Sequence, residues 1–133
     1  MFDHVNWVAV LGAAIAAFAI GAIWYGPLFG KRWAGLIGMG MGGDGGSVMR
    51  PLAVNFLMGV VGATALAVLV TPFAKDALTA AFVGALVWVA SGLAVKLNDL
   101  TFARRPVALF YIDSLGHLIS LVVMAIIVST FRV

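Results

Sequence analysis

Four long apolar stretches dominate the sequence and leave little choice of fold. They cover approximately residues 5–25, 51–71, 77–97 and 107–131. A helix of about 20 apolar residues is long enough to cross the roughly 30 Å hydrocarbon core of a bilayer. We therefore expect an all-α membrane protein, a compact bundle of four transmembrane helices that forms a single membrane domain of residues 1–133.

The composition supports a membrane protein and argues against several other classes. Apolar residues make up 64% of the 133 residues and charged residues 10%, with no glutamate, whereas soluble domains carry about 25% charged residues. The net charge of +3 comes without the interleaved aromatic and basic residues of a nucleic-acid-binding module. The chain has no cysteine and only two histidines, so we expect no metal, no cofactor and no nucleic-acid partner.

The distribution of lysine and arginine predicts the orientation of the helices. The first and third connections, counted with Lys96, carry six of these residues, and the opposite side carries Lys75 and Arg132. Lysine and arginine collect on the cytoplasmic side of membrane proteins. We therefore expect the N-terminus and the C-terminus both to lie outside, with neighbouring helices antiparallel across the short later connections.

Small residues recur at every fourth position in three of the apolar stretches. The series are Ala13, Ala17 and Gly21; Gly59, Ala63 and Ala67; and Gly84 and Gly92 around Trp88. Small side chains let membrane helices approach closely, although alanine is also simply common in membrane spans. Four such thin helices enclose little volume. We therefore expect the protein to contact the lipid bilayer and also to form a homo-oligomer or to bind a membrane-protein partner.

Residues 34–50 are rich in glycine, and Gly38, Gly40 and Gly43 match a G-x-G-x-x-G pattern. In a dinucleotide-binding fold this pattern follows a strand and opens a helix. Here no strand precedes it and no ordinary soluble helix follows it. We interpret the segment as a flexible cytoplasmic loop.

The sharpest functional signal lies in the last stretch, where Asp113 and His117 are one helical turn apart and Ser120 follows. Residues at this spacing share a helix face. An unpaired charge that faces lipid costs several kcal/mol, so the pair must face protein or water. At 1.5 Å per residue, Asp113 lies roughly 10 Å and His117 roughly 16 Å from the helix start at Pro106.

Other polar residues of the apolar stretches lie at comparable depth. The same counting puts Asn55 about 6 Å and Ser91 about 12 Å inside, and we expect both to approach the pair on the last helix. Lys96 is the natural counter-ion of Asp113. It lies about 140° from Ser91 around an ideal helix, so both cannot face Asp113 squarely, and Lys96 can instead extend towards the headgroups.

Two functions of different class fit this polar set. An aspartate and a histidine on one face can relay a proton or bind a cation, as in a small channel- or transporter-like protein that handles a proton or small polar solute. The same groups can also hold helices together, as in a non-catalytic scaffold or accessory subunit of a larger complex. A lipid-acting enzyme ranks third, because Ser114 and Ser120 beside His117 are weak nucleophile candidates; we expect no enzyme.

Five basic residues flank the cytoplasmic helix ends and form a candidate rim for anionic lipid headgroups: Lys31, Arg32, Arg50, Arg104 and Arg105. The second and fourth helices begin on this side, so their positive dipole ends add to the charge. The ordinary cytoplasmic excess of lysine and arginine accounts for the same residues, and we prefer that explanation.

An aromatic segment follows the first stretch. Pro27 is expected to end the first helix, and Trp24, Tyr25 and Trp33 suit the headgroup region. The segment resembles the signature of an uncharacterised bacterial family of small four-helix membrane proteins, domain of unknown function 1761. The shared residues are Gly21, Trp24, Tyr25, Pro27, Gly30, Lys31 and Trp33, with Phe29 one position early.

A second block of the same resemblance covers 98–102, Arg105 and Pro106, and 112–120, so that the two blocks bracket all four stretches. The resemblance implies the four-helix fold, its topology and a multi-pass protein of the bacterial inner membrane. It implies no activity, and no functional residue follows from it.

Overall fold

A computed structural model describes residues 1–38 and 49–132, and every regular element in these ranges is helical. Four helices are long and apolar enough to cross a membrane: Trp7–Leu28, Met49–Val70, Ala77–Thr101 and Val107–Thr130. The predicted all-α fold with four spans is confirmed. The protein is thus a multi-pass membrane protein.

The spans are built from shorter helical elements. In chain order these are α1 (Trp7–Ile23), the π-helical turn η1 (Trp24–Leu28), α2 (Gly30–Ile37), α3 (Met49–Val70), α4 (Ala77–Val87), the π-helical turn η2 (Trp88–Leu93), α5 (Ala94–Thr101) and α6 (Val107–Thr130). The first span joins α1 to η1, and the third joins α4, η2 and α5 into one helix.

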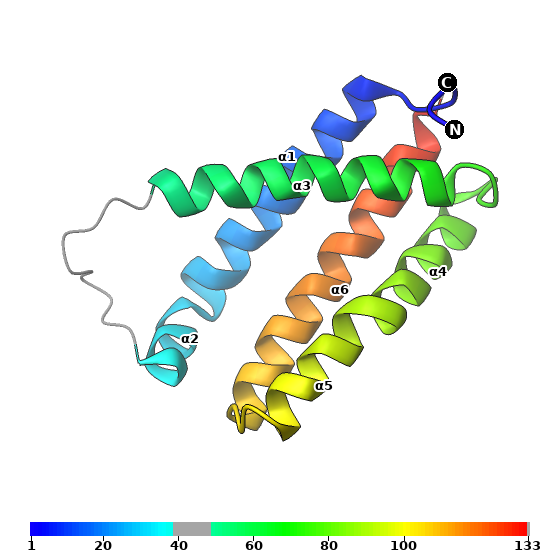
Figure 1. Ribbon diagram of the computed structural model, residues 1–133. Helices are drawn as coiled ribbons and strands as arrows, with labels where there is room; N and C mark the ends of the chain where they lie inside the picture. Colours follow the sequence, from blue (N-terminus) through cyan, green and yellow to red (C-terminus); the bar gives the residue numbers. More distant parts are fainter. Residues whose placement is uncertain (39–48, 133) are drawn as a thin grey trace.

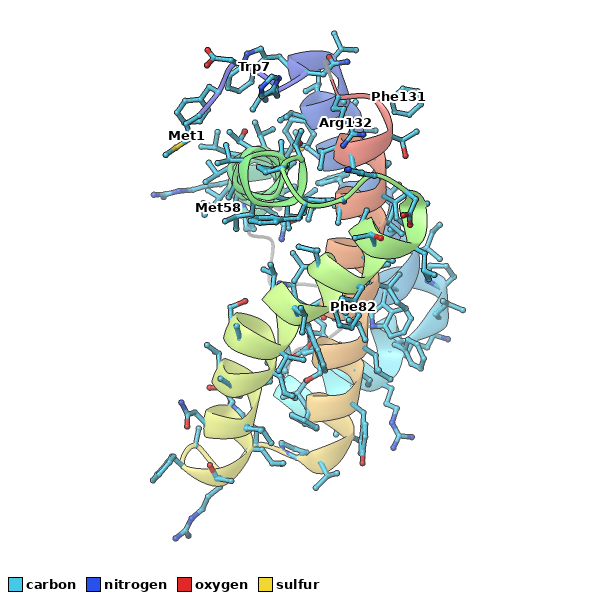
Figure 2. All side chains as sticks on the ribbon, turned by 90° about the vertical axis from the view of Figure 1, so that its right-hand side faces the viewer. Met1, Trp7, Met58, Phe82, Phe131 and Arg132 are labelled. Atoms are coloured by element: carbon cyan, nitrogen blue, oxygen red, sulfur yellow. The ribbon has the colours of Figure 1, made fainter. Side chains whose placement is uncertain are left out.

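Helix α6 is the centre of the bundle. It contacts α1, α3 and α4, and Figure 1 shows α1, α6 and the α4–α5 helix side by side, with α3 crossing them at a steep angle. Viewed from the side, α3 is seen almost end-on (Figure 2). The apolar core fills the half of the bundle that α3 covers and includes Val10, Ala13, Ala63, Leu66, Ala67, Val70, Ala80, Leu121, Met124, Ala125 and Val128.

Both termini lie at this covered end, beside the turn between α3 and α4 (Figure 1). The Asn6 side-chain amide donates to the Phe131 carbonyl at 2.6 Å. Arg132 donates to the carbonyls of Ala74 at 2.5 Å and Thr71 at 3.3 Å, and Figure 2 shows Phe131 and Arg132 at this end. The termini therefore share one end of the bundle; that this end is outside stays a prediction.

Pro27 does not end the first helix, contrary to the sequence prediction. It lies inside η1, and the chain leaves helical geometry at Phe29, with φ −125° and ψ 6°. The Phe29 N–H donates to the Trp24 carbonyl at 2.9 Å, which closes a ring one residue wider than an α turn. Such a widened turn accommodates the proline ring, which would clash in a regular α-helix.

The predicted loop at 34–50 begins later than expected. Helix α2 continues to Ile37, and Gly38 terminates it with φ 79°, a left-handed conformation that glycine adopts without steric cost. Gly40 and Gly43, with the rest of 39–48, lie outside the described residues. Helix α3 already starts at Met49.

The third span is also longer than the predicted stretch of 77–97. Asn98 and Asp99, expected in a loop, belong to α5, which continues to Thr101. The expected Asp76 cap is present, because its carboxylate accepts from the Thr79 N–H at 2.8 Å. The extra turn of α5 brings Asp99 to the polar site described below.

Candidate functional site

Asp113 lies in α6 towards the end of the bundle opposite the termini, and two other spans supply its partners. The Tyr25 hydroxyl of η1 donates to its Oδ1 at 2.7 Å. Lys96 Nζ of α5 lies 4.0 Å from its Oδ2, and the Asp113 side chain is 20% exposed. A carboxylate at this depth needs a counter-charge, and here the first, third and fourth spans meet at it.

Lys96 is shared between two carboxylates. Its Nζ lies 3.9 Å from Asp99 Oδ2, one turn along α5, and 4.0 Å from Asp113 Oδ2 on α6. The sequence leaves two positions open for Lys96, beside Asp113 or directed away from it towards the headgroups. In the structure Lys96 lies beside Asp113 and is its counter-ion. The ammonium group bridges two helices with nearly equal distances to its acceptors.

A cavity of about 190 Å³ opens beside this ion pair. Its charged lining residues are Lys96, Asp99, Arg105 and Asp113, and its apolar and aromatic lining residues are Trp33, Ile37, Leu100, Leu109 and Phe110. Arg105 is exposed in the connection between α5 and α6. The cavity is therefore reached from the end of the bundle opposite the termini.

Two tryptophan side chains fix α6 on either side of Asp113. Trp24 Nε1 of η1 donates to the Ile112 carbonyl at 2.8 Å, and Trp88 Nε1 of η2 donates to the Ser114 carbonyl at 3.0 Å. Each π turn thus supplies an indole donor to a carbonyl next to the site. These bonds restrict rotation of α6 and keep the carboxylate towards Tyr25 and Lys96.

His117 does not join Asp113. It is exposed, and its ring lies against Gly92 of η2, where an added Cβ would be 2.5 Å from Nδ1. None of the hydrogen bonds in the described residues involves its side chain. Nor is it paired with a serine: Ser114 is buried, with its Oγ unpartnered among the described residues, and Ser120 is half-buried.

The other polar residues expected near Asp113 lie elsewhere. Ser91 is exposed and donates to the Val87 carbonyl of its own helix at 2.7 Å. Asn55 is exposed on α3, in a hollow that it shares with Arg50 and Met58. The predicted convergence of Asn55 and Ser91 on the Asp113 pair is therefore wrong, because counting residues gives a position along the helix axis but neither the direction of the side chain nor the crossing angle of the helix.

The five basic residues of the candidate rim are all exposed: Lys31, Arg32, Arg50, Arg104 and Arg105. They belong to α2, to the start of α3 and to the connection before α6. Among them, only Arg105 lines the cavity beside Asp113. Arg105 is thus the member of the rim that reaches the site.

Tyr25 is a site residue that the sequence does not predict. Its aromatic segment predicts a place for Tyr25 and Trp33 at the membrane interface, whereas the two rings pack edge to face at 5.2 Å beside the cavity, and Tyr25 binds Asp113. The available signal was spacing. Tyr25 follows Gly21 by four residues and Lys96 follows Gly92 by four, so both extend a small-residue series.

Comparison with known proteins gives one match. A family model described as a protein of unknown function, DUF1761, matches residues 8–129. No curated protein and no solved structure matches the chain.

Proposed function

The chain belongs to the DUF1761 family of proteins of unknown function, and we propose that this multi-pass membrane protein is a small transporter-like protein that handles a proton or small polar solute at Asp113. The observation that carries the proposal is the shared lysine. Asp113 lines a cavity at one end of the bundle, and its counter-ion Lys96 has a second carboxylate, Asp99, at a nearly equal distance.

The shared lysine allows Asp113 to lose its charge at low cost. If Asp113 takes up a proton or binds a cationic group, Lys96 stays paired with Asp99, so no ammonium is left alone at membrane depth. Removing one partner of an isolated buried ion pair costs about 3–5 kcal/mol. A lysine with two acceptors avoids much of this cost, as reversible occupancy of the site requires.

Access supports the same function. Exposed Arg105 lies on the lining of the cavity, so a solute reaches Asp113 from the end opposite the termini. The other half of the bundle is filled by apolar side chains such as Leu121, Met124 and Val128. In this proposal the site is open to one end, and passage to the other requires movement of the helices against α6.

A scaffold or accessory subunit is the second candidate, and a different aspect of the same geometry favours it. Asp113 is fully partnered by Tyr25 and Lys96, and Trp24 and Trp88 tie both neighbouring spans to α6. A cluster whose only task is to join three helices would have these bonds too. Neither proposal involves enzymatic chemistry.

Proton flux into liposomes separates the two candidates, because neutralisation of Asp113 is part of the transport cycle proposed. The purified protein is reconstituted with an internal pH-sensitive dye, and a potassium diffusion potential drives flux. Asp113→Asn should abolish most of the flux. Asp76→Asn is the matched control, since it also removes one carboxylate but caps α4 at the opposite end; it should retain the flux, as should His117→Ala.

Circular dichroism and size-exclusion chromatography establish that each variant is folded. Wild-type flux no higher than in empty liposomes would refute proton handling, and a destabilised Asp113→Asn protein would then favour the scaffold. Equal loss of flux in Asp113→Asn and Asp76→Asn would also refute the proposal, because the effect would not be specific to the cavity.

A further inference from the structure

The charges that line the cavity are balanced but unevenly paired. Lys96 and Arg105 oppose Asp99 and Asp113. Lys96 serves both carboxylates, whereas Arg105 has no ion-pair partner among the described residues. Within the described part of the chain, the Arg105 guanidinium is thus free of ion pairs, and two carboxylates share the Lys96 ammonium.

From this arrangement we propose that the cavity binds a zwitterion, a group with an ammonium and a phosphate or carboxylate a few bonds apart. The inference rests on the proposed function, for which it names the class of solute. The anionic end binds Arg105, and the ammonium end binds beside Asp99. A ligand of one charge alone satisfies only one of these two groups.

The backbone fixes the anion-binding half. The Arg105 N–H donates to the Asp99 carbonyl at 3.1 Å, and Arg104 turns the chain with φ 53°, a left-handed conformation that is uncommon for a residue with a side chain. The guanidinium and the Asp99 carboxylate therefore start from neighbouring backbone positions. A guanidinium binds carboxylate or phosphate through two parallel hydrogen bonds.

The cation-binding half combines charge and an aromatic wall. The Asp99 side chain is 49% exposed, so it can accept a second cation while it keeps Lys96. Trp33 lines the same cavity, and an indole face attracts an ammonium group within about 6 Å. The apolar remainder of the wall suits the short carbon chain between the two charges.

The size of the cavity limits the ligand. Its volume of about 190 Å³ is below the roughly 300–1,000 Å³ of pockets for drug-sized molecules. It corresponds to roughly six water molecules at about 30 Å³ each. A zwitterion of this size occurs as a free solute or as the headgroup of phosphatidylethanolamine, which reaches the cavity from the bilayer surface.

The test measures binding to the full-length protein in an uncharged detergent by isothermal titration calorimetry. The probes are phosphoethanolamine, β-alanine, and two half-ligands, ethanolamine and methyl phosphate. We expect at least one zwitterion to bind about tenfold or more tightly than either half-ligand, because only the zwitterion pairs both halves of the site. Arg105→Asn should weaken that binding about tenfold.

Arg104→Asn is the matched control. It removes an arginine from the same connection, asparagine tolerates the left-handed conformation, and Arg104 is not among the residues that line the cavity. It should keep the wild-type affinity. Equal weakening by both variants would overturn the inference, since general rim charge would then explain binding. Methyl phosphate or ethanolamine binding as tightly as the zwitterion would overturn it too.

Native mass spectrometry after extraction from vesicles of phosphatidylethanolamine and phosphatidylglycerol distinguishes the sources. Preferential retention of phosphatidylethanolamine, lost in Arg105→Asn, supports a headgroup; binding of soluble zwitterions without such retention supports a free solute. Absence of both refutes zwitterion binding. Asp113-dependent proton flux without zwitterion binding overturns this inference alone, whereas zwitterion binding without proton flux overturns only the proposed proton handling.

Discussion

Replacing Gly84 by alanine places a methyl group in a close contact between α4 and α6. The new Cβ would lie 3.0 Å from Ala125 Cβ, 3.1 Å from the Leu121 carbonyl oxygen and 3.3 Å from Val122 Cα. Carbon atoms pack at about 3.5–4.0 Å. None of the three atoms is the end of a flexible side chain, so the two helices must move apart by roughly 0.5 Å.

Two opposing terms determine the size of the effect. Alanine is better than glycine in a helix interior by about 1 kcal/mol, whereas overpacking a tight contact costs about 1–3 kcal/mol. The middle of the range for the packing cost, less the gain in helix propensity, predicts that Gly84→Ala lowers the free energy of unfolding by about 1 kcal/mol. Gly62→Ala is the matched control on α3, because no atom lies within 4 Å of its added Cβ. Without the packing cost, it should raise stability by up to about 1 kcal/mol.

The assay is reversible unfolding in mixed micelles, with sodium dodecyl sulfate as the denaturant and far-ultraviolet circular dichroism as the signal. The two variants should differ by about 2 kcal/mol, with opposite signs relative to the wild type. If Gly84→Ala were as stable as Gly62→Ala, the close approach of α4 to α6 would not exist in the protein, and the placement of Lys96 beside Asp113 would lose its support.

Three further predictions concern the ends of the helices and use the same unfolding assay. Asn6→Ala removes both the cap of α1 and the bond to the Phe131 carbonyl and should cost about 2 kcal/mol; Asn6→Ser, which keeps a capping oxygen, should cost about half of that. Hydrogen bonds from the Thr79 N–H and then from its hydroxyl lower the pKa of Asp76, so the unfolded state takes up this proton first as the pH falls. The stability advantage of the wild type over Asp76→Ala should therefore be complete above the ordinary carboxyl pKa and disappear as the pH falls through the lower folded pKa; an advantage independent of pH would contradict this cause. Arg104→Gly should keep or increase stability, because the left-handed conformation at φ 53° costs a residue with a side chain about 1 kcal/mol, and Arg104→Val should decrease it.

The sequence predicts the spans well because one physical quantity determines them. A run of about 20 apolar residues is stable only as a helix in hydrocarbon, and the four observed spans follow the four runs. Asp113 was predictable for the same reason, since a carboxylate inside such a run needs a partner. Lys96 is its natural counter-ion, because it is the lysine at the near end of the third apolar stretch.

The remaining parts of the site depend on directions that the sequence does not encode locally. Asn55 belongs to α3, which crosses the other spans at a steep angle, so counting residues along α3 does not give its depth. It is exposed in a different hollow from that of Asp113. Tyrosine is a residue type that is common at membrane interfaces. The hydrogen bond from Tyr25 to Asp113 depends instead on the packing of the first span against α6. His117 follows Asp113 by one helical turn and is expected on the same helix face, yet its ring lies against Gly92. Position along each helix was predictable, whereas rotation about the helix axis and the crossing angle of α3 were not.

The π turn η2 allows a repeat of four residues to follow one line of contact along α6. The contacts of this line come from Gly84, Trp88, Gly92 and Lys96. In a regular α-helix each step of four residues rotates the side chain by roughly 40°, so three steps amount to roughly 120°, enough to turn Lys96 away from α6. The wider turn at Trp88–Leu93 underwinds the helix and offsets part of this drift. The meeting of Lys96 and Asp113 thus depends on helical phase. Removal of a single residue from η2 would leave every charge in place and shorten the span by only one residue, yet would direct the lysine towards lipid.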